Sequence, residues 1–114
     1  MKQRISIKPL SVNACWQGKR FKTPTYKAYE KEALLKLKAA RVPDGKLHLI
    51  LTIGLSSKLA DIDNICKPFI DIMQKRFKFN DRFIYKLTVK KIDVAKGSEF
   101  IEFELLALIE NNLN

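Results

Sequence analysis

The spacing of apolar residues changes several times along this chain, and this change restricts the fold more than any other feature. Between residues 46 and 55, the sequence KLHLILTIGL places leucine or isoleucine at every second position, which is typical of a β-strand. Between residues 64 and 77, apolar residues recur every three or four positions, which predicts an amphipathic helix. A chain with both patterns is expected to pack helices against a sheet.

The remaining segments extend this pattern. RISIKPL at 4–10, the segment at 83–94 and the alternating segment at 99–108 predict further strands, and the AKGS turn at 95–98 favours a hairpin between the last two. A helix is predicted over 25–40, capped by Thr23 or Thr25. The predicted order is β-α-β-α-β-β, an α/β (α+β) fold in which a small mixed sheet carries two helices on at least one face. We expect residues 1–114 to form a single domain.

The charge of the chain indicates its class of partner. Lysine and arginine number 22 against 12 aspartates and glutamates, for a formal net charge of +10. This excess favours an anionic partner, most commonly a nucleic acid. A membrane partner is not expected, because no basic amphipathic helix, membrane-spanning run or signal-peptide region is found. The two cysteines give no disulfide framework, so we expect a cytoplasmic protein with free thiols.

Against this basic background, four of the acidic residues lie close together, at Asp61, Asp63, Asp71 and Asp81. Carboxylates form an all-oxygen environment, which suits Mg²⁺ or Mn²⁺ and not zinc. A basic surface that holds a phosphate backbone, beside carboxylates that hold a cation, is the outline of a metal-dependent nuclease.

Pro68 predicts where the helix begins. Proline has no N–H to donate to the carbonyl group of Asn64, and its ring clashes with that carbonyl inside a regular helix. We therefore expect the helix to start near Asn64 or Ile65, with Asp63 or Asn64 as its cap.

Two interpretations of the aspartates follow. In an extended segment before the helix, Asp61 and Asp63 would point to the same side and share one ion, with Lys67 in the first turn near a phosphate. Alternatively, the acids before the helix only cap its free N–H groups and complement its dipole. In either case Asp71 is expected to be solvated or to pair with Lys67, four residues earlier.

At these residues the chain resembles the RusA family of Holliday-junction resolvases. The resemblance rests on a D-x-D-N-x-x-K motif at 61–67, on Asp81 after the helix and on a Ser-Val-Asn segment at 11–13. Residues 91–97 resemble the strand and KG turn of the family, so the match spans nearly the whole chain.

The resemblance implies a homodimeric, Mg²⁺-dependent endodeoxyribonuclease, for which Mn²⁺ is a possible substitute. It implies paired, symmetric nicks in four-way DNA junctions during DNA recombination and repair, and a bacterial, prophage or phage source. By position, Asp61, Asp63 and Asp81 are the catalytic carboxylates and metal ligands, and Lys67 is the catalytic basic residue. The family often has a second acid where this chain has Asn80, which leaves its metal preference open.

The length of the second helix raises a geometric problem. A helix over 64–77 is about 20 Å long, with Asp63 at one end and Asp81 just beyond the other. Ligands of one ion must lie within about 2.6 Å of it. Either residues 78–81 fold far back, or Asp81 comes from the partner subunit. Antiparallel helices across a two-fold axis would give composite sites in a homodimer.

Basic residues suggest where branched DNA binds. The segment CWQGKRFK at 15–22 interleaves cations with Trp16 and Phe21, which are candidates for stacking on an unpaired base or for the core. A second group of cations surrounds Asp81. Asn13 is a candidate phosphate ligand or a turn residue. The predicted DNA-binding residues are Asn13, Lys19, Arg20, Lys22, Lys67, Arg76, Lys78, Arg82 and Lys91.

Two rival functions remain open. One is a structure-selective nuclease for other branched DNA, such as flaps and forks. The other is a non-catalytic, basic nucleic-acid-binding module whose aspartates are only helix caps. Divalent-dependent nicking of a synthetic four-way junction separates these alternatives.

Overall fold

A computed structural model of the chain describes residues 1–18 and 21–109. The larger elements follow the predicted order, which confirms a mixed α+β fold. Between the first long strand and the first helix, residues 12–14, 16–17 and 21–22 also form a 3₁₀ turn and two short strands that the sequence did not predict. The elements are β1 (Lys2–Ser6), η1 (Val12–Ala14), β2 (Trp16–Gln17), β3 (Phe21–Lys22), α1 (Pro24–Lys36), β4 (Leu47–Leu55), α2 (Ile62–Phe77), η2 (Asp81–Phe83), β5 (Ile84–Asp93) and β6 (Phe100–Ala107).

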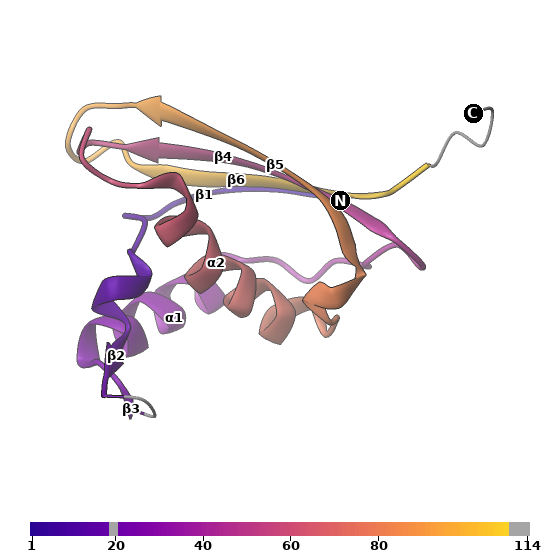
Figure 1. Ribbon diagram of the computed structural model, residues 1–114, viewed down its shortest axis with the longest axis horizontal. Coiled ribbons are helices and arrows are strands. Elements are labelled where there is room, and N and C mark those ends of the chain that lie inside the picture. Colours follow the sequence, from indigo (N-terminus) through magenta and orange to yellow (C-terminus); the bar gives the residue numbers. More distant parts are fainter. Residues whose placement is uncertain (19–20, 110–114) are drawn as a thin grey trace.

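The main sheet has four strands in the order β1-β6-β4-β5. β5 is parallel to β4, whereas β6 is antiparallel to both β4 and β1. Parallel neighbours need a long crossover connection, and here α2 supplies it. Figure 1 shows α1 and α2 on the same side of this sheet, so the prediction of helices on at least one face is confirmed.

The predicted hairpin between the last two strands is wrong. β5 and β6 lie on opposite sides of β4, and the connection between them crosses the end of that strand. The amide of Val94 donates to the carbonyl of Leu55 (2.9 Å) on the way. Adjacent strands are about 4.8 Å apart, so the six residues between β5 and β6 are long enough to pass over one strand. β4 takes the central place because its inner-face side chains are almost wholly buried.

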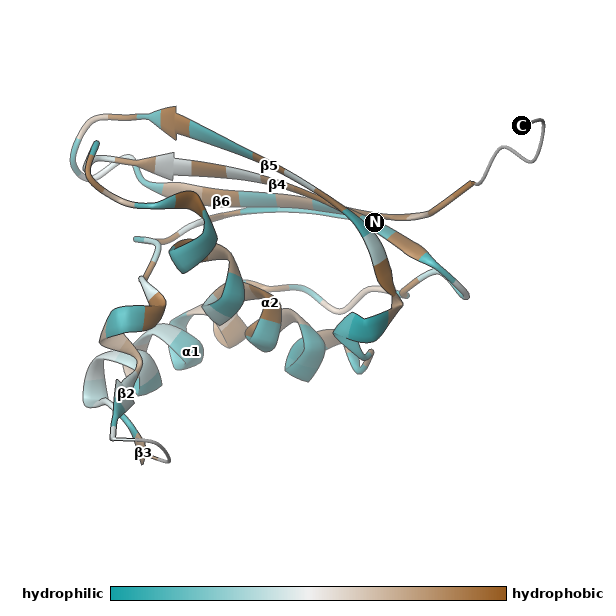
Figure 2. Ribbon diagram, in the orientation of Figure 1, coloured by the Kyte–Doolittle hydropathy of each residue, from teal (hydrophilic) through white to brown (hydrophobic). Residues whose placement is uncertain are grey.

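The core lies between α2 and the sheet. The predicted apolar face of α2 is buried, and the Phe69 and Phe77 rings pack on the Phe103 ring of β6 at centroid distances of 6.0 and 5.6 Å. In Figure 2, hydrophobic and hydrophilic residues both occur along α2, as expected for a helix with one covered face. The other face of α2 is therefore free to carry polar side chains.

The first helix begins as predicted and ends early. The Thr23 hydroxyl accepts a hydrogen bond from the Tyr26 amide at 3.1 Å, which confirms Thr23 as one of the two expected caps. The helix ends at Lys36, and not at 40, because Leu37 adopts an extended conformation. The Arg76 side chain of α2 donates to the Leu37 carbonyl group at 3.1 Å, so the exposed carbonyl at this helix end has a partner.

Candidate functional site

One exposed stripe of α2 gathers the polar residues singled out in the sequence. Asp63, Lys67 and Asp71 follow one another at steps of four, so they lie on the same face of the helix. The buried residues of α2 lie on its other side and fix the helix against the sheet. The stripe therefore points its charged groups away from the core.

The start of α2 differs from the prediction. The helix begins at Ile62, two residues earlier than expected, with Asp61 at the N-cap position. Pro68 removes only the hydrogen bond to the carbonyl of Asn64, and the preceding turn still forms. In that turn the Ile62 carbonyl also accepts a contact from the Cys66 thiol at 3.1 Å. The proposed caps, Asp63 and Asn64, are thus helical residues.

The two aspartates at this end therefore do not share one extended segment. Asp61 is extended and makes no side-chain capping bond, while Asp63 lies within the first turn. Asp63 accepts from the amide of Asn64 at 3.0 Å, and the side-chain amide of Asn64 lies 3.5 Å from the Asp61 carboxylate. Asn64 is thus in contact with both acids.

The chain reverses direction after α2. Lys78 adopts the left-handed conformation (φ 57°), and its amide bonds to the Gln74 carbonyl at 2.9 Å. The Asn80 side chain accepts from the Arg82 amide at 2.9 Å and so caps η2. The Asp81 amide then donates to the Gln74 side-chain carbonyl at 2.8 Å. Asp81 therefore lies beside α2 of its own chain, and a composite site shared with a partner subunit stays a prediction.

Lys67 joins the stripe to residues 78–83, which fold back after α2 and are called the returning segment below. Its ammonium group lies 2.9 Å from the Asp71 carboxylate and 3.3 Å from that of Asp81. The hydrogen bond to Asp71 is the main reason that the pKa of Lys67 is raised, with a further contribution from Asp81. Lys67 is therefore a stable cation between two carboxylates, which confirms the expected Lys67–Asp71 pair.

The donor chemistry of this region fits Mg²⁺, because all its acidic ligands are oxygens. Within residues 1–18 and 21–109, however, no three acidic, histidine or cysteine side chains lie close enough together to hold a metal ion. The Lys67 ammonium sits between two of the acids. Mg²⁺ keeps several waters and often binds through one or two carboxylates plus substrate phosphate, so a full protein shell is not required.

Among the described residues, four of the predicted DNA-binding side chains form hydrogen bonds or ion pairs within the chain. Lys22 pairs with Glu30 at 3.0 Å, and Lys91 donates to the Ala60 carbonyl at 2.8 Å. Lys67 and Arg76 make the contacts described above. Because Lys75 also reaches Glu30, at 3.1 Å, this acid ties β3 and α2 to α1.

The other predicted DNA-binding residues fall into two groups. Asn13, Lys78 and Arg82 are exposed, and the Arg82 guanidinium lies over the Phe83 ring at 5.0 Å. Lys78 and Arg82 lie on either side of Asp81 in the segment that follows α2. Lys19 and Arg20 lie outside the described residues.

The aromatic residues of the basic segment belong to the small β2–β3 pair. Phe21 is 72% exposed and Trp16 is 44% exposed, so neither is a core residue. The Trp16 ring packs edge-on against Tyr26 at 5.8 Å, which leaves part of its surface accessible. Both side chains are therefore open to a partner.

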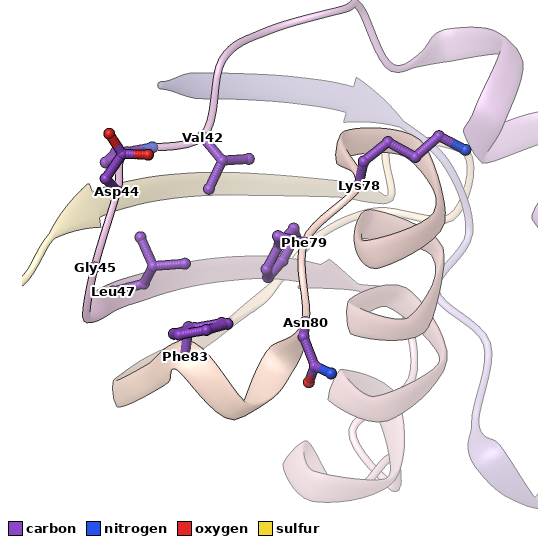
Figure 3. A pocket seen from close by; sticks show the side chains of 9 residues that line it. Val42, Asp44, Gly45, Leu47, Lys78, Phe79, Asn80 and Phe83 are labelled. Atoms are coloured by element: carbon purple, nitrogen blue, oxygen red, sulfur yellow. The ribbon is translucent and has the colours of Figure 1, made fainter.

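A pocket of about 560 Å³ lies on the other side of the returning segment. In Figure 3 the side chains of Val42, Leu47, Phe79 and Phe83 point into it, whereas Asn80 points away. None of the aspartates of the candidate site lines this pocket. The carboxylate site is instead an open surface, since the side chains of Lys67 and Asp81 are 58% and 38% exposed.

Sequence reasoning missed Gln74. This half-buried side chain bonds to the Asp81 amide and also donates to Asp71 at 3.3 Å. A signal for it was present, because Gln74 follows Asp71 by three residues and so continues the stripe of Asp63 and Lys67.

Comparisons with known proteins do not assign this chain. No protein-family model matches it, and a search of curated proteins found no match. Among the helices of the described residues, none has the length and apolar character needed to cross a membrane.

Proposed function

We propose that this chain is a Mg²⁺-dependent endodeoxyribonuclease that cuts four-way DNA junctions, as its resemblance to the RusA family implies. One observation carries the proposal: Asp81 returns to Lys67, one helical turn from Asp63 on the same face of α2. Lys67 and Asp81 of the motif are in contact, and Asp63 lies on the same face of the helix as Lys67. Asp61, Asp63 and Asp81 are the proposed metal ligands, of which one or two would bind the ion at a time, with water and phosphate oxygens completing its coordination.

The expected roles follow from the chemistry of these groups. A bound Mg²⁺ would polarise the scissile phosphate and lower the pKa of an attacking water. The Lys67 ammonium is held against the Asp71 and Asp81 carboxylates and is suited to bind a phosphate oxygen. An open site also fits a polymeric substrate, because a DNA backbone reaches an exposed surface without entering a pocket.

The charge distribution supports a DNA substrate. The net charge of +10 favours binding to phosphates, and Lys78 and Arg82 lie on the segment that carries Asp81. Paired nicks on a four-way junction require two sites, which a homodimer would supply. Since Asp81 reaches α2 of its own chain, each protomer would contribute a whole site.

The test is nicking of a synthetic four-way junction across a Mg²⁺ and Mn²⁺ titration, with duplex, flap and fork DNA as comparisons. The proposal expects metal-dependent, symmetric nicks that favour the junction. Faster cutting of flaps or forks would support the structure-selective alternative instead. Binding of junctions without cutting at any metal concentration would contradict both nuclease functions.

One observation favours a second function, a non-catalytic nucleic-acid-binding module. Lys67 already pairs with both Asp71 and Asp81 and offsets one of their two negative charges, and the described residues hold no three-acid group around a possible ion. In this function the stripe would stabilise the returning segment and leave the basic surface to bind DNA. Junction binding that ignores divalent ions would then be expected.

A further inference from the structure

We propose that Gln74 and Asp71 form a bracket that positions Asp81 and Lys67 for metal and phosphate binding. The inference rests on the proposed nuclease function and adds two positioning residues that the family motif, as matched here, does not contain. It is carried by four contacts that link the stripe of α2 to the returning segment.

Gln74 is the central part of the bracket. Its side-chain carbonyl accepts the Asp81 amide at 2.8 Å, and its side-chain N–H group donates to Asp71 at 3.3 Å. A glutamine offers both a donor and an acceptor, so it can join an acid on one side to a backbone amide on the other. The bond to Asp71 fixes the orientation of the Gln74 side-chain amide, so that its oxygen points toward the Asp81 amide.

Lys67 closes the network. It bonds to Asp71 at 2.9 Å and to Asp81 at 3.3 Å, so Asp81 is held both through its backbone and through its carboxylate. The same Asp71 oxygen serves both Lys67 and Gln74. An isolated surface pair at i,i+4 would leave the position of Asp81 unaffected. Here the pair is linked to a residue that lies outside the helix.

This arrangement addresses a particular weakness of the site. Asp81 lies in a three-residue 3₁₀ turn, and such short turns have little rigidity of their own. Metal affinity depends on how well the ligands are held, and loss of a group that orients a ligand commonly weakens it by about 10- to 100-fold. Gln74 supplies that support from the rigid helix.

The test compares Gln74→Met with Gln3→Met. Gln3 is a matched control, because its side chain also accepts from a backbone amide and donates from its N–H group, in this case both with Lys38, at 2.8 and 2.7 Å. In metal-free protein, Gln74→Met is expected to speed hydrogen exchange at the Asp81 amide by about fivefold, as one lost hydrogen bond implies. Gln74→Met should also bind Mn²⁺ about tenfold more weakly or worse. Electron paramagnetic resonance of the protein with Mn²⁺ alone measures this affinity. Gln3→Met should do neither.

A second pair of variants tests Asp71. Asp71→Ala removes the acceptor that orients Gln74, so exchange at the Asp81 amide should also accelerate, though less than in Gln74→Met. Glu32→Ala is its control, since Glu32 forms the same type of i,i+4 pair with Lys36 on α1, at 2.8 Å. A purely structural role for Asp71 predicts equal, small losses of stability in both variants and no change at Asp81.

The outcomes separate the bracket from the function on which it rests. If Gln74→Met binds Mn²⁺ with wild-type affinity and its Asp81 amide exchanges at the wild-type rate, the bracket is overturned and the proposed function is not. Faster exchange with unchanged Mn²⁺ affinity would overturn its role in metal binding. A wild-type protein that neither binds Mn²⁺ nor cuts junctions would overturn the proposed function, and the metal-binding part of the bracket with it.

Discussion

The Lys67 ammonium lies 3.3 Å from the carboxylate of Asp81, although 14 residues separate them and Asp81 follows the end of the helix that carries Lys67. This contact is possible because Lys78 turns the chain back along α2. It places the last acid of the predicted site beside the stripe that begins at Asp63.

Removing either outer acid should abolish cutting without abolishing binding. We expect Asp63→Asn and Asp81→Asn each to reduce junction nicking in Mg²⁺ by at least about a hundredfold, because a lost carboxylate removes charge that holds the metal. Junction binding in gel-shift assays should be kept or tightened, since each change removes a negative charge facing DNA.

Asp44→Asn is the matched control for these variants. Asp44 is an exposed aspartate before β4, away from the stripe, and its loss should leave nicking near the wild-type rate. Equal losses in Asp44→Asn and Asp63→Asn would indicate a general charge effect and contradict the assigned site.

Mixing inactive variants tests whether each protomer holds a complete site. Because Asp81 contacts Lys67 of its own chain, a heterodimer of Asp63→Asn and Asp81→Asn should carry one defect in each site. We therefore expect no recovery of nicking when the two proteins are unfolded, mixed and refolded together. Composite sites would instead give each heterodimer one intact site, and because random mixing makes about half of the dimers heterodimers, activity would recover toward about a quarter of the wild-type value. A wild-type protein mixed with Asp63→Asn serves as the reference for exchange of subunits.

Sequence spacing predicted the larger elements but not their neighbours. The alternation in β6 marks it as a strand, because alternate residues of β6 face the core. It contains no information about which strand lies alongside. The partners were decided by α2, whose crossover makes β5 parallel to β4, and by the connection that carries β6 over the end of β4.

For the candidate site, the sequence indicates residues but little of their geometry. The motif indicated Asp61, Asp63, Lys67 and Asp81, and the i,i+4 spacing predicted the Lys67–Asp71 pair. The fold-back of Asp81 was only one of two alternatives, because it depends on a left-handed Lys78, and lysine is not a residue that favours that conformation. A sequence pattern cannot reveal such a conformation.

The basic residues should divide into those that bind DNA and those that hold the fold. Lys78→Gln and Arg82→Gln are each expected to weaken junction binding about three- to tenfold and to lower the salt slope of log affinity by about 1, as one lost phosphate contact implies. Affinity measured by fluorescence anisotropy over a range of salt concentrations gives both values.

Arg76→Met is the contrasting variant. In the wild type, the Arg76 guanidinium donates to the Leu37 carbonyl. We therefore expect the variant to lose about 1 kcal/mol of unfolding free energy in urea, with the salt slope of DNA binding unchanged. A lower salt slope in Arg76→Met would restore this residue to the DNA-binding surface. Unchanged slopes in Lys78→Gln and Arg82→Gln would remove those two residues from it.

The last prediction concerns acid stability and depends on Glu30. Burial alone would raise the pKa of this carboxyl, but hydrogen bonds and ion pairs with Lys22 and Lys75 outweigh it, and the pKa lies below its ordinary value of 4.5. A carboxyl with a lowered folded-state pKa stabilises the protein above the unfolded value, and this contribution is lost as the pH falls through the folded-state pKa. Glu30→Gln should therefore cost about 1 kcal/mol of unfolding free energy at pH 7.

The difference between wild type and Glu30→Gln should shrink as the pH falls below 4.5, because the wild-type carboxyl then becomes protonated and neutral. Urea unfolding at steps from neutral pH into this acidic range measures it. Glu32→Gln is the control: its pair with Lys36 is 48% and 42% exposed, and its loss should have little effect at any pH. A Glu30→Gln deficit that persists undiminished in acid would show that Glu30 acts through packing, and not through its charge.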